Sequence, residues 1–205
     1  MVDDRERFDN AVARIDAANA DDPGHERVDG QSVAKELIYG RRMSEMLDRL
    51  APDSPEALQL AVRSQHIRRW EIPRASYPQT PFGYKQWRAR LLKFHAEAAA
   101  AILRDVGYDE AIVGKVQSLL RKEGFKVNPD TQTLEDVADL VFLEHYLADF
   151  AATHPQYDEA KLTGILRKIW RKMSADGRAA ALTRIYLPER LAPLIWKAAA
   201  EGGGE

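Results

Sequence analysis

Three separated segments of the chain place histidine or aspartate side chains among apolar, helix-forming residues. His66 lies in LAVRSQHIRRW, His95 in FHAEAAAAIL, and Asp136 and Asp139 in LEDVADLVFLE. A polar group on the inward face of a helix costs free energy unless a partner, a proton or a metal ion satisfies it. If the three segments converge, their imidazole and carboxylate groups form one candidate site for a divalent cation.

The two aspartates belong to a segment predicted to be a central helix, because its apolar residues form two stripes on nearly opposite sides. Asp136 and Asp139 are three residues apart and therefore neighbours on the helix surface, whereas Glu135 is expected to point elsewhere. We interpret Asp139 as the metal ligand of this segment. The alternative is that both aspartates are solvated near the helix start or pair with an arginine.

The two histidines have different expected surroundings. His95 shares a helix face with Trp87 and Leu91, so it is either a metal ligand or a core histidine bonded to a backbone carbonyl or an aspartate. Glu97 lies roughly 200 degrees further around that helix and does not join it. His66 is a boundary residue, either a metal ligand or a partly exposed histidine at a basic helix end.

Charge is unevenly distributed, although the net charge is only -2. Residues 63–93 contain eight lysines or arginines and one acid, whereas residues 130–149 contain six acids and neither lysine nor arginine. If the two segments face each other, the acids can hold a cation while arginines bind phosphate oxygens; mutual salt bridges are the alternative. The residues expected to bind a phosphate-containing substrate are Arg69, Arg74, Tyr84 and Arg88.

The elements that position these residues are predicted to be helices, since apolar residues recur at the helical period and no strand-type alternation is convincing. We expect an all-α, single multi-helix domain over residues 1–200 and a flexible tail over 201–205. Loops are expected at 21–30 and 72–83, where proline and glycine cluster. The expected helices span about 4–20, 32–50, 55–73, 84–106, 109–122 and 130–153, followed by three shorter helices with start signals at Ser174 and at Leu187-Pro188.

Composition removes several classes of protein. The chain has no cysteine, which excludes disulfides, cysteine-rich zinc sites and thiol nucleophiles. Its first residues, MVDDRERFDN, are charged, and no stretch has the apolar run that a bilayer requires, so we expect a cytoplasmic protein with no membrane partner. The sequence also lacks P-loop, nucleophile-elbow and HExxH signatures.

A series of motifs runs through most of the chain, from ELIYGRRM through QHIRRWEIPR, YP, GY, WR, FHA and LEDVADLVFLE to RKIWRKMSADG. In combination these motifs are specific, and they resemble an uncharacterised family, the domain-of-unknown-function 4202 family. That resemblance implies no established activity.

The same segments resemble, more distantly, the HD superfamily of metal-dependent phosphohydrolases, in which a histidine, a His-Asp pair and a later aspartate hold divalent metal. Tyr39 matches the opening histidine, while Gln65 and His66 match the His-Asp pair. His95 matches an additional histidine, and Asp139 matches the last aspartate. The resemblance implies an HD-like helical core with extra N- and C-terminal helices, in which Tyr39 and Gln65 replace two ligands.

The site is compatible with two functions. One is an atypical HD-like hydrolase of a small phosphorylated or nucleotide substrate, with a divalent metal on His66, His95 and Asp139 and with Asp136 as base or supporting acid. The other is a non-catalytic nucleotide- or RNA-binding module that uses the basic aromatic segment 63–93. A purely structural role, in which the polar groups fix helix register, is a third interpretation. The aromatic residues expected to stack on bases are Trp70, Tyr77, Tyr84 and Trp87.

Overall fold

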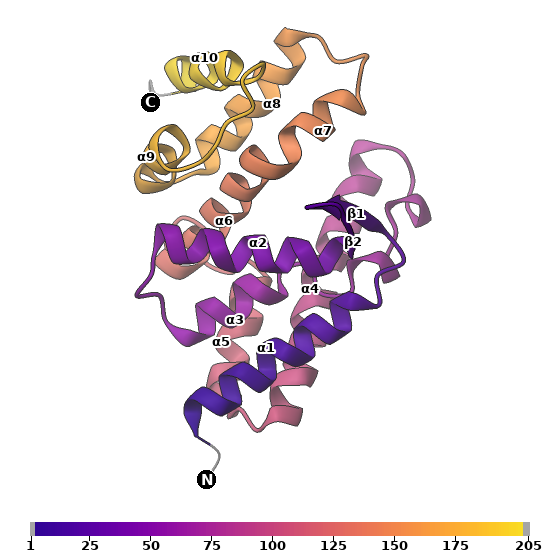
Figure 1. Ribbon diagram of the computed structural model, residues 1–205, viewed down its shortest axis with the longest axis vertical. Helices are drawn as coiled ribbons and strands as arrows, with labels where there is room; N and C mark the ends of the chain where they lie inside the picture. Colours follow the sequence, from indigo (N-terminus) through magenta and orange to yellow (C-terminus); the bar gives the residue numbers. More distant parts are fainter. Residues whose placement is uncertain (1–2, 203–205) are drawn as a thin grey trace.

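The computed structural model describes residues 3–202, and α-helices make up most of it (Figure 1). The all-α prediction is therefore confirmed. The helices of the first half are α1 (Asp4–Ala20), α2 (Lys35–Leu50), α3 (Glu56–Ser64) and α4 (Pro81–Val106). Those of the second half are α5 (Glu110–Leu120), α6 (Pro129–Val141), α7 (Leu147–Ala152), α8 (Glu159–Lys172), α9 (Ala175–Thr183) and α10 (Ala192–Gly202).

Capping side chains set several of these boundaries. Asp158 and Ser174 accept hydrogen bonds from backbone N–H groups in the first turns of α8 and α9. Thr80 caps α4 and Pro81 occupies its first position, so this helix begins three residues before the predicted start. Gly107, in the left-handed conformation with φ of 92°, ends α4 where the sequence predicts.

Residues 21–34 differ from the prediction of a loop followed by a helix from position 32. They contain an antiparallel hairpin of β1 (His25–Val28) and β2 (Gln31–Ala34). Its turn is Asp29-Gly30, with φ values of 50° and 80°. Two positive φ values are what a two-residue hairpin turn requires, and Asp-Gly is a preferred sequence for it. The dipeptide is the signal in the sequence, because strands of four residues are too short to show a clear alternation.

Two predicted helices have a more complex form. The run from Pro129 to Ala152 is continuous, but a π-helical turn at Phe142–Tyr146 separates α6 from α7 (Figure 1). Such turns are frequent at functional sites. The helix expected to reach residue 73 ends at Ser64, and two short 3-10 turns follow, at Arg69–Glu71 and Arg74–Ser76.

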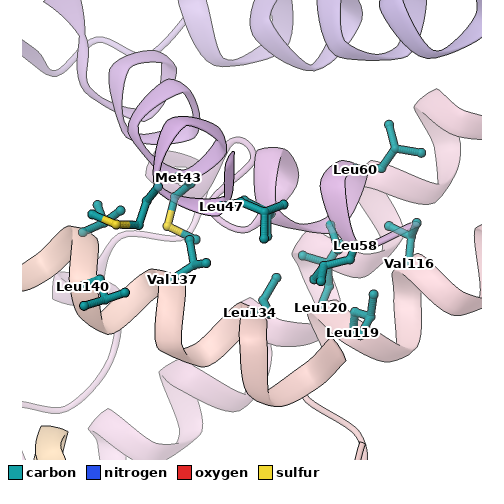
Figure 2. Packing of buried hydrophobic residues seen from close by; sticks show 14 of the residues in the cluster. Met43, Leu47, Leu58, Leu60, Val116, Leu119, Leu120, Leu134, Val137 and Leu140 are labelled. Atoms are coloured by element: carbon teal, nitrogen blue, oxygen red, sulfur yellow. The ribbon is translucent and has the colours of Figure 1, made fainter. Parts of the chain in front are cut away.

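One hydrophobic cluster contains buried residues from each of α1 to α10. Figure 2 shows its centre, where Met43 and Leu47 of α2 lie against Val137 and Leu140 of α6. Full burial of one such side chain contributes about 1.5–3 kcal/mol. This packing fixes the rotation of α6 against α2 and thereby decides which acids of α6 face the site.

The last three helices lie together at one end of the molecule, beside α6 and α7 (Figure 1). Of the predicted tail, Glu201 and Gly202 belong to α10, whereas 203–205 lie outside the described residues. Among the helices of residues 3–202, none has the length and apolar character needed to span a bilayer.

Candidate functional site

A pocket of about 900 Å³ lies between the hairpin, α2, the end of α3, α4, the α6–α7 run and the end of α8. We call it the central pocket. Most of the candidate residues found in the sequence line it, namely Tyr39, Gln65, His66, Arg69, Tyr84, Arg88 and Asp139. Three others, His95, Arg74 and Asp136, are not among its lining residues.

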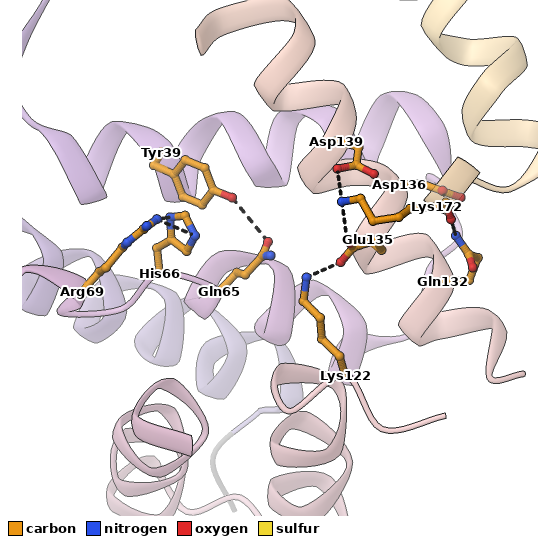
Figure 3. A network of polar contacts seen from close by, with 10 residues as sticks. All are labelled: Tyr39, Gln65, His66, Arg69, Lys122, Gln132, Glu135, Asp136, Asp139 and Lys172. Atoms are coloured by element: carbon orange, nitrogen blue, oxygen red, sulfur yellow. Dashed lines mark hydrogen bonds and ion pairs between the residues drawn. The ribbon is translucent and has the colours of Figure 1, made fainter. Parts of the chain in front are cut away.

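Tyr39 stacks on His66 at one wall of the pocket, with ring centroids 4.0 Å apart and 12° between the ring planes. The Tyr39 hydroxyl donates to Oε1 of Gln65 at 3.5 Å (Figure 3). Burial raises the pKa of Tyr39 above its ordinary value, so the phenol remains a protonated donor at neutral pH. Tyr39 and Gln65 therefore bond to each other, and Tyr39 holds the imidazole of His66 in place.

His66 is held in its neutral form. Arg69 Nη1 lies 3.0 Å from Nε2 of His66, and because a guanidinium can only donate, we assign this ring nitrogen as the acceptor. The other ring nitrogen, Nδ1, lies 3.3 Å from Oε2 of Glu36. Burial and the neighbouring Arg69 lower the pKa of His66 well below its ordinary value. Both ring nitrogens thus face protein partners.

His95 has the surroundings of a core histidine. It is 3% exposed, and its Nδ1 donates to the backbone oxygen of Ile67 at 2.9 Å. Burial lowers the pKa of His95 to about 3, so the ring is neutral. Its Nε2 atom has no hydrogen-bond partner among the described residues. The ring centroids of His95 and His66 are 5.9 Å apart.

Asp139 belongs to a group of four charged residues that we call the buried ion cluster, Lys122, Glu135, Asp139 and Lys172 (Figure 3). Lys172 Nζ lies 2.8 Å from Oδ1 of Asp139 and 2.8 Å from Oε1 of Glu135, and Lys122 pairs with the other Glu135 oxygen. Burial raises the pKa of Asp139 to about 6, against the effect of Lys172. Although burial opposes it, the two lysines lower the pKa of Glu135 to about 2.

The positions of the α6 acids correct the helical-wheel prediction. Glu135, expected to point elsewhere, shares Lys172 with Asp139, because residues four apart are also neighbours on a helix. Asp136 turns instead toward the start of α9, where it accepts hydrogen bonds from the backbone N–H and the hydroxyl of Ser174. Gln132 also donates to it, at 3.0 Å. Asp136 therefore secures a helix start and is not among the lining residues of the central pocket.

The predicted phosphate-binding residues separate into two groups. Arg69, Arg88 and Tyr84 line the pocket, and Tyr84 is 48% exposed. Arg74 instead donates to the backbone oxygens of Tyr77 and Pro78, at 3.0 and 2.9 Å, and so closes the proline-rich loop. Arg74 therefore lies outside the central pocket, in contrast to Arg69 and Arg88.

The aromatic residues predicted to stack on bases are mostly covered. Trp87 is 7% exposed, and its indole N–H donates to the backbone oxygen of Ile72 at 2.8 Å. Arg69 lies over its ring, 5.0 Å from the centroid. Trp70 and Tyr77 are half-buried. Only Tyr84 of the four is exposed, so the segment does not present an open row of rings.

The predicted metal ligands do not form a cation site. Throughout residues 3–202, no group of three or more histidine, cysteine, aspartate or glutamate side chains is arranged to hold a metal ion. The chemistry of the donors agrees, because the Lys172 ammonium sits on Asp139 and both nitrogens of His66 face other groups. The residues present therefore do not fit the divalent metal that the HD resemblance implies.

The pocket residues that were not singled out from the sequence as site residues include Lys35, Glu36, Lys122 and Lys172. Glu36 and Lys35 lie in the first turn of α2, whose start the sequence analysis placed at residue 32. Lys172 ends α8, and Lys122 lies two residues beyond α5. Residues 130–149 contain six acids and no lysine or arginine. That imbalance is the signal in the sequence that cations from distant parts of the chain must pair with the buried acids.

Comparison with known proteins gives one result. A family model described as Domain of unknown function (DUF4202) matches residues 9–195. No curated protein and no solved structure matches the chain.

Proposed function

Because the chain belongs to the DUF4202 family, whose description names no activity, we propose its function from the pocket: it binds a small phosphorylated molecule, such as a nucleotide, through Lys35, Arg69 and Arg88. The observation that carries the proposal is the balance of charge in the central pocket. Most of its carboxylates have cationic partners, whereas three of its cations form no ion pair with a carboxylate of residues 3–202.

The carboxylates are accounted for first. Glu26 pairs with Arg42 at 2.5 Å, and Glu135 and Asp139 pair with the lysines of the buried ion cluster. Burial raises the pKa of Glu36 to about 7, although Arg69 opposes this effect. Glu36 is therefore only about half ionised at neutral pH. Asp149 is the remaining carboxylate of the pocket, and it is exposed.

Among the residues that the structure describes, three cations of the central pocket lack the ion-pair partners that most of its carboxylates have. Lys35 and Arg88 make no side-chain hydrogen bond or ion pair with any described residue, and Arg69 donates only to His66, which is neutral. A guanidinium binds phosphate oxygens in bidentate fashion, with charge-assisted hydrogen bonds that are stronger than neutral ones. The pocket is therefore electrostatically suited to an anion with several oxygens.

The size and lining of the pocket support a small molecule. Its volume of about 900 Å³ lies within the range of ligand pockets in proteins. Apolar surface is available from Phe142 and Phe150, and Tyr84 stands at the exposed side. A phosphate at the arginines and a planar or apolar group against these rings would use both kinds of surface.

Titration calorimetry with AMP, ribose 5-phosphate and inorganic phosphate tests the proposal, with adenosine as the ligand that lacks phosphate. We expect binding of at least one phosphate compound and none of adenosine at the same concentration. Arg88→Ala should weaken binding by about tenfold or more, since a charge-assisted hydrogen bond contributes about 1.5–3 kcal/mol. Arg90→Ala, an exposed arginine of the same helix outside the pocket, is the matched control. Absence of binding by all three phosphates would contradict the proposal.

Metal-independent hydrolysis of the bound phosphate ester is the second candidate, and the position of Glu36 favours it. Glu36 lines the pocket, lies 3.3 Å from His66, and forms no ion pair with a lysine or arginine in the described part of the chain. A carboxyl group with a pKa near 7 suits proton transfer at neutral pH. A panel of phosphomonoesters assayed in EDTA tests this role. We expect the wild-type protein to hydrolyse at least one of these esters and the Glu36→Gln variant to be inactive. If Glu36→Gln retains the activity, Glu36 is not the acid–base group.

The two functions considered from the sequence, metal-dependent hydrolysis and RNA binding, are less well supported. Metal-dependent hydrolysis needs His66, His95 and Asp139 on one ion, whereas each of them has a different protein partner. RNA stacking needs exposed rings, and Tyr84 alone of the four aromatic residues is exposed. Binding of a small phosphate compound in the pocket requires neither arrangement.

A further inference from the structure

The buried ion cluster joins two lysines and two carboxylates from three parts of the chain (Figure 3). Glu135 and Asp139 come from α6, Lys172 from the end of α8, and Lys122 from the segment after α5. Lys172 Nζ lies 2.8 Å from one oxygen of each carboxylate. Lys122 binds the second oxygen of Glu135. The two positive and two negative charges cancel within the cluster.

Burial explains why the carboxylates need these partners. Glu135 and Asp139 are each 6% exposed, and an ionised carboxylate out of water is costly unless a cation satisfies it. The side chain of Lys172 is 40% exposed, so it reaches the cluster from the surface. Lys122 has φ of 58°, a left-handed conformation that non-glycine residues rarely adopt. The chain thus keeps an unfavourable backbone conformation at the residue that supplies the second ammonium.

The position of Lys172 is the position that a divalent cation would need. Its nitrogen bridges two carboxylate oxygens from residues one helical turn apart. A hard divalent cation bound by the same side chains would lie between the same oxygens, at about 2.0–2.6 Å from each. An ammonium and a metal ion cannot both occupy this place.

Nearby imidazoles do not provide substitute ligands. His66 faces Arg69 with one ring nitrogen and Glu36 with the other. His95 uses Nδ1 to donate to a backbone oxygen. A metal ion entering the pocket would have to displace Lys172 without gaining a ready set of nitrogen ligands.

We propose that the Lys172 ammonium is a built-in cation that takes the place of a divalent metal ion between Glu135 and Asp139, so that the wild-type protein excludes divalent metal from the central pocket. This inference concerns the choice of cation and does not depend on the phosphate ligand proposed above. It predicts that removal of one ammonium group creates a metal site.

Manganese(II) alone is the probe, and calorimetry together with the paramagnetic resonance signal of free Mn²⁺ counts the ions bound per chain. The wild-type protein should show no stoichiometric binding. Lys172→Ala leaves two carboxylates with one lysine, and we expect it to bind one Mn²⁺ per chain at least about tenfold more tightly than the wild type. Lys168→Ala, an exposed lysine one turn earlier on α8, is the matched control and should behave as the wild type.

A double variant locates the new site. Lys172→Ala combined with Asp139→Asn leaves one carboxylate and one lysine, so Mn²⁺ binding should be lost again. The proposal is overturned if the wild type binds one Mn²⁺ with the affinity of Lys172→Ala, if a folded Lys172→Ala variant binds none, or if the double variant still binds one.

A measurement on the wild type keeps the test decisive should Lys172→Ala fail to fold. Metal that binds the native state raises the midpoint of thermal unfolding, Tm, by mass action. The wild-type Tm should be equal in MnCl₂ and in EDTA. A Mn²⁺-dependent rise in Tm that saturates at one ion per chain overturns the proposal.

Discussion

Asp136 accepts two hydrogen bonds from Ser174, one from the backbone N–H at 2.9 Å and one from the hydroxyl at 2.5 Å. Ser174 in turn caps α9 by accepting from the backbone N–H of Gly177. Asp136 is 3% exposed, so its carboxylate depends on these donors. Asp136, predicted from the sequence to act as a base or supporting acid, thus fixes the start of α9 against α6.

Replacement of Asp136 should therefore affect stability more than ligand binding. Asp136→Ala leaves the donors of Ser174 and Gln132 without their acceptor, which should lower the free energy of unfolding by about 2–3 kcal/mol. Urea unfolding measures this loss, and titration with the phosphate compounds should give affinity close to that of the wild type. If the Asp136→Ala protein is as stable as the wild type but has lost ligand binding, Asp136 takes part in binding the ligand.

The contact between α6 and α9 is close enough to require glycine at position 177. A Cβ atom there would lie 2.7 Å from Cγ of Asp136, well inside van der Waals contact. Gly177→Ala should lower the free energy of unfolding by about 1–3 kcal/mol, because the Asp136 side chain must shift and weaken its hydrogen bonds to Ser174. Gly164→Ala on α8 is the matched control, since outside the local backbone of α8 no atom of the described residues lies within 4 Å of its added Cβ. That variant should be stabilised by about 0.5–1 kcal/mol, and equal losses in both variants would contradict the packing argument.

Stability should depend on pH through Glu36. Its pKa is about 7 in the folded protein against 4.5 as the ordinary value, so the folded state prefers the protonated form. This contribution is fully present below pH 4.5 and is lost as the pH rises through 7. Glu36→Gln removes the titration, so its stability relative to the wild type should increase between pH 4 and pH 8 by up to about 3 kcal/mol. Urea unfolding at both pH values measures the change, and a constant difference would show that Glu36 titrates normally.

His95 should make the protein sensitive to acid. Its pKa is lowered from 6.5 to about 3, so its contribution is present above pH 6.5 and is lost as the pH falls toward 3. Protonation in the unfolded chain should remove about 3 kcal/mol of stability by pH 4. His95→Asn keeps a donor for the oxygen of Ile67 but does not titrate, so it should lose correspondingly less stability between pH 7 and pH 4. Equal losses in the two proteins would place the acid sensitivity elsewhere.

The helical elements were largely predictable because their signals are local. The cap of α9 at Ser174, the end of α4 at Gly107 and the span of α1 all follow from neighbouring residues. The hairpin was missed because its strands are short, and its Asp29-Gly30 turn was the one strong indication. The π turn at Phe142–Tyr146 has no capping side chain and contains neither glycine nor proline, so no local signal marks it in the sequence.

The candidate site was predictable only in part. The sequence analysis expected the segments of His66 and Asp139 to converge, and both residues line one pocket together with Tyr39. Their partners were not predictable in this way. Lys172 lies 33 residues after Asp139, and Lys122 lies 13 residues before Glu135, beyond the range of any helical periodicity.

The sequence by itself determined the helices, most of their ends and the set of polar groups that had to be satisfied inside, because propensity, capping and burial cost act over a few neighbouring residues. Tertiary packing decided how α6 is rotated and which charge meets which. A rotation of α6 that turned Asp136 as well as Asp139 toward the pocket would have suited the predicted metal site. The observed packing brings two lysine ammonium groups to these acids, because buried carboxylates are stable only beside the cations that the rest of the fold supplies.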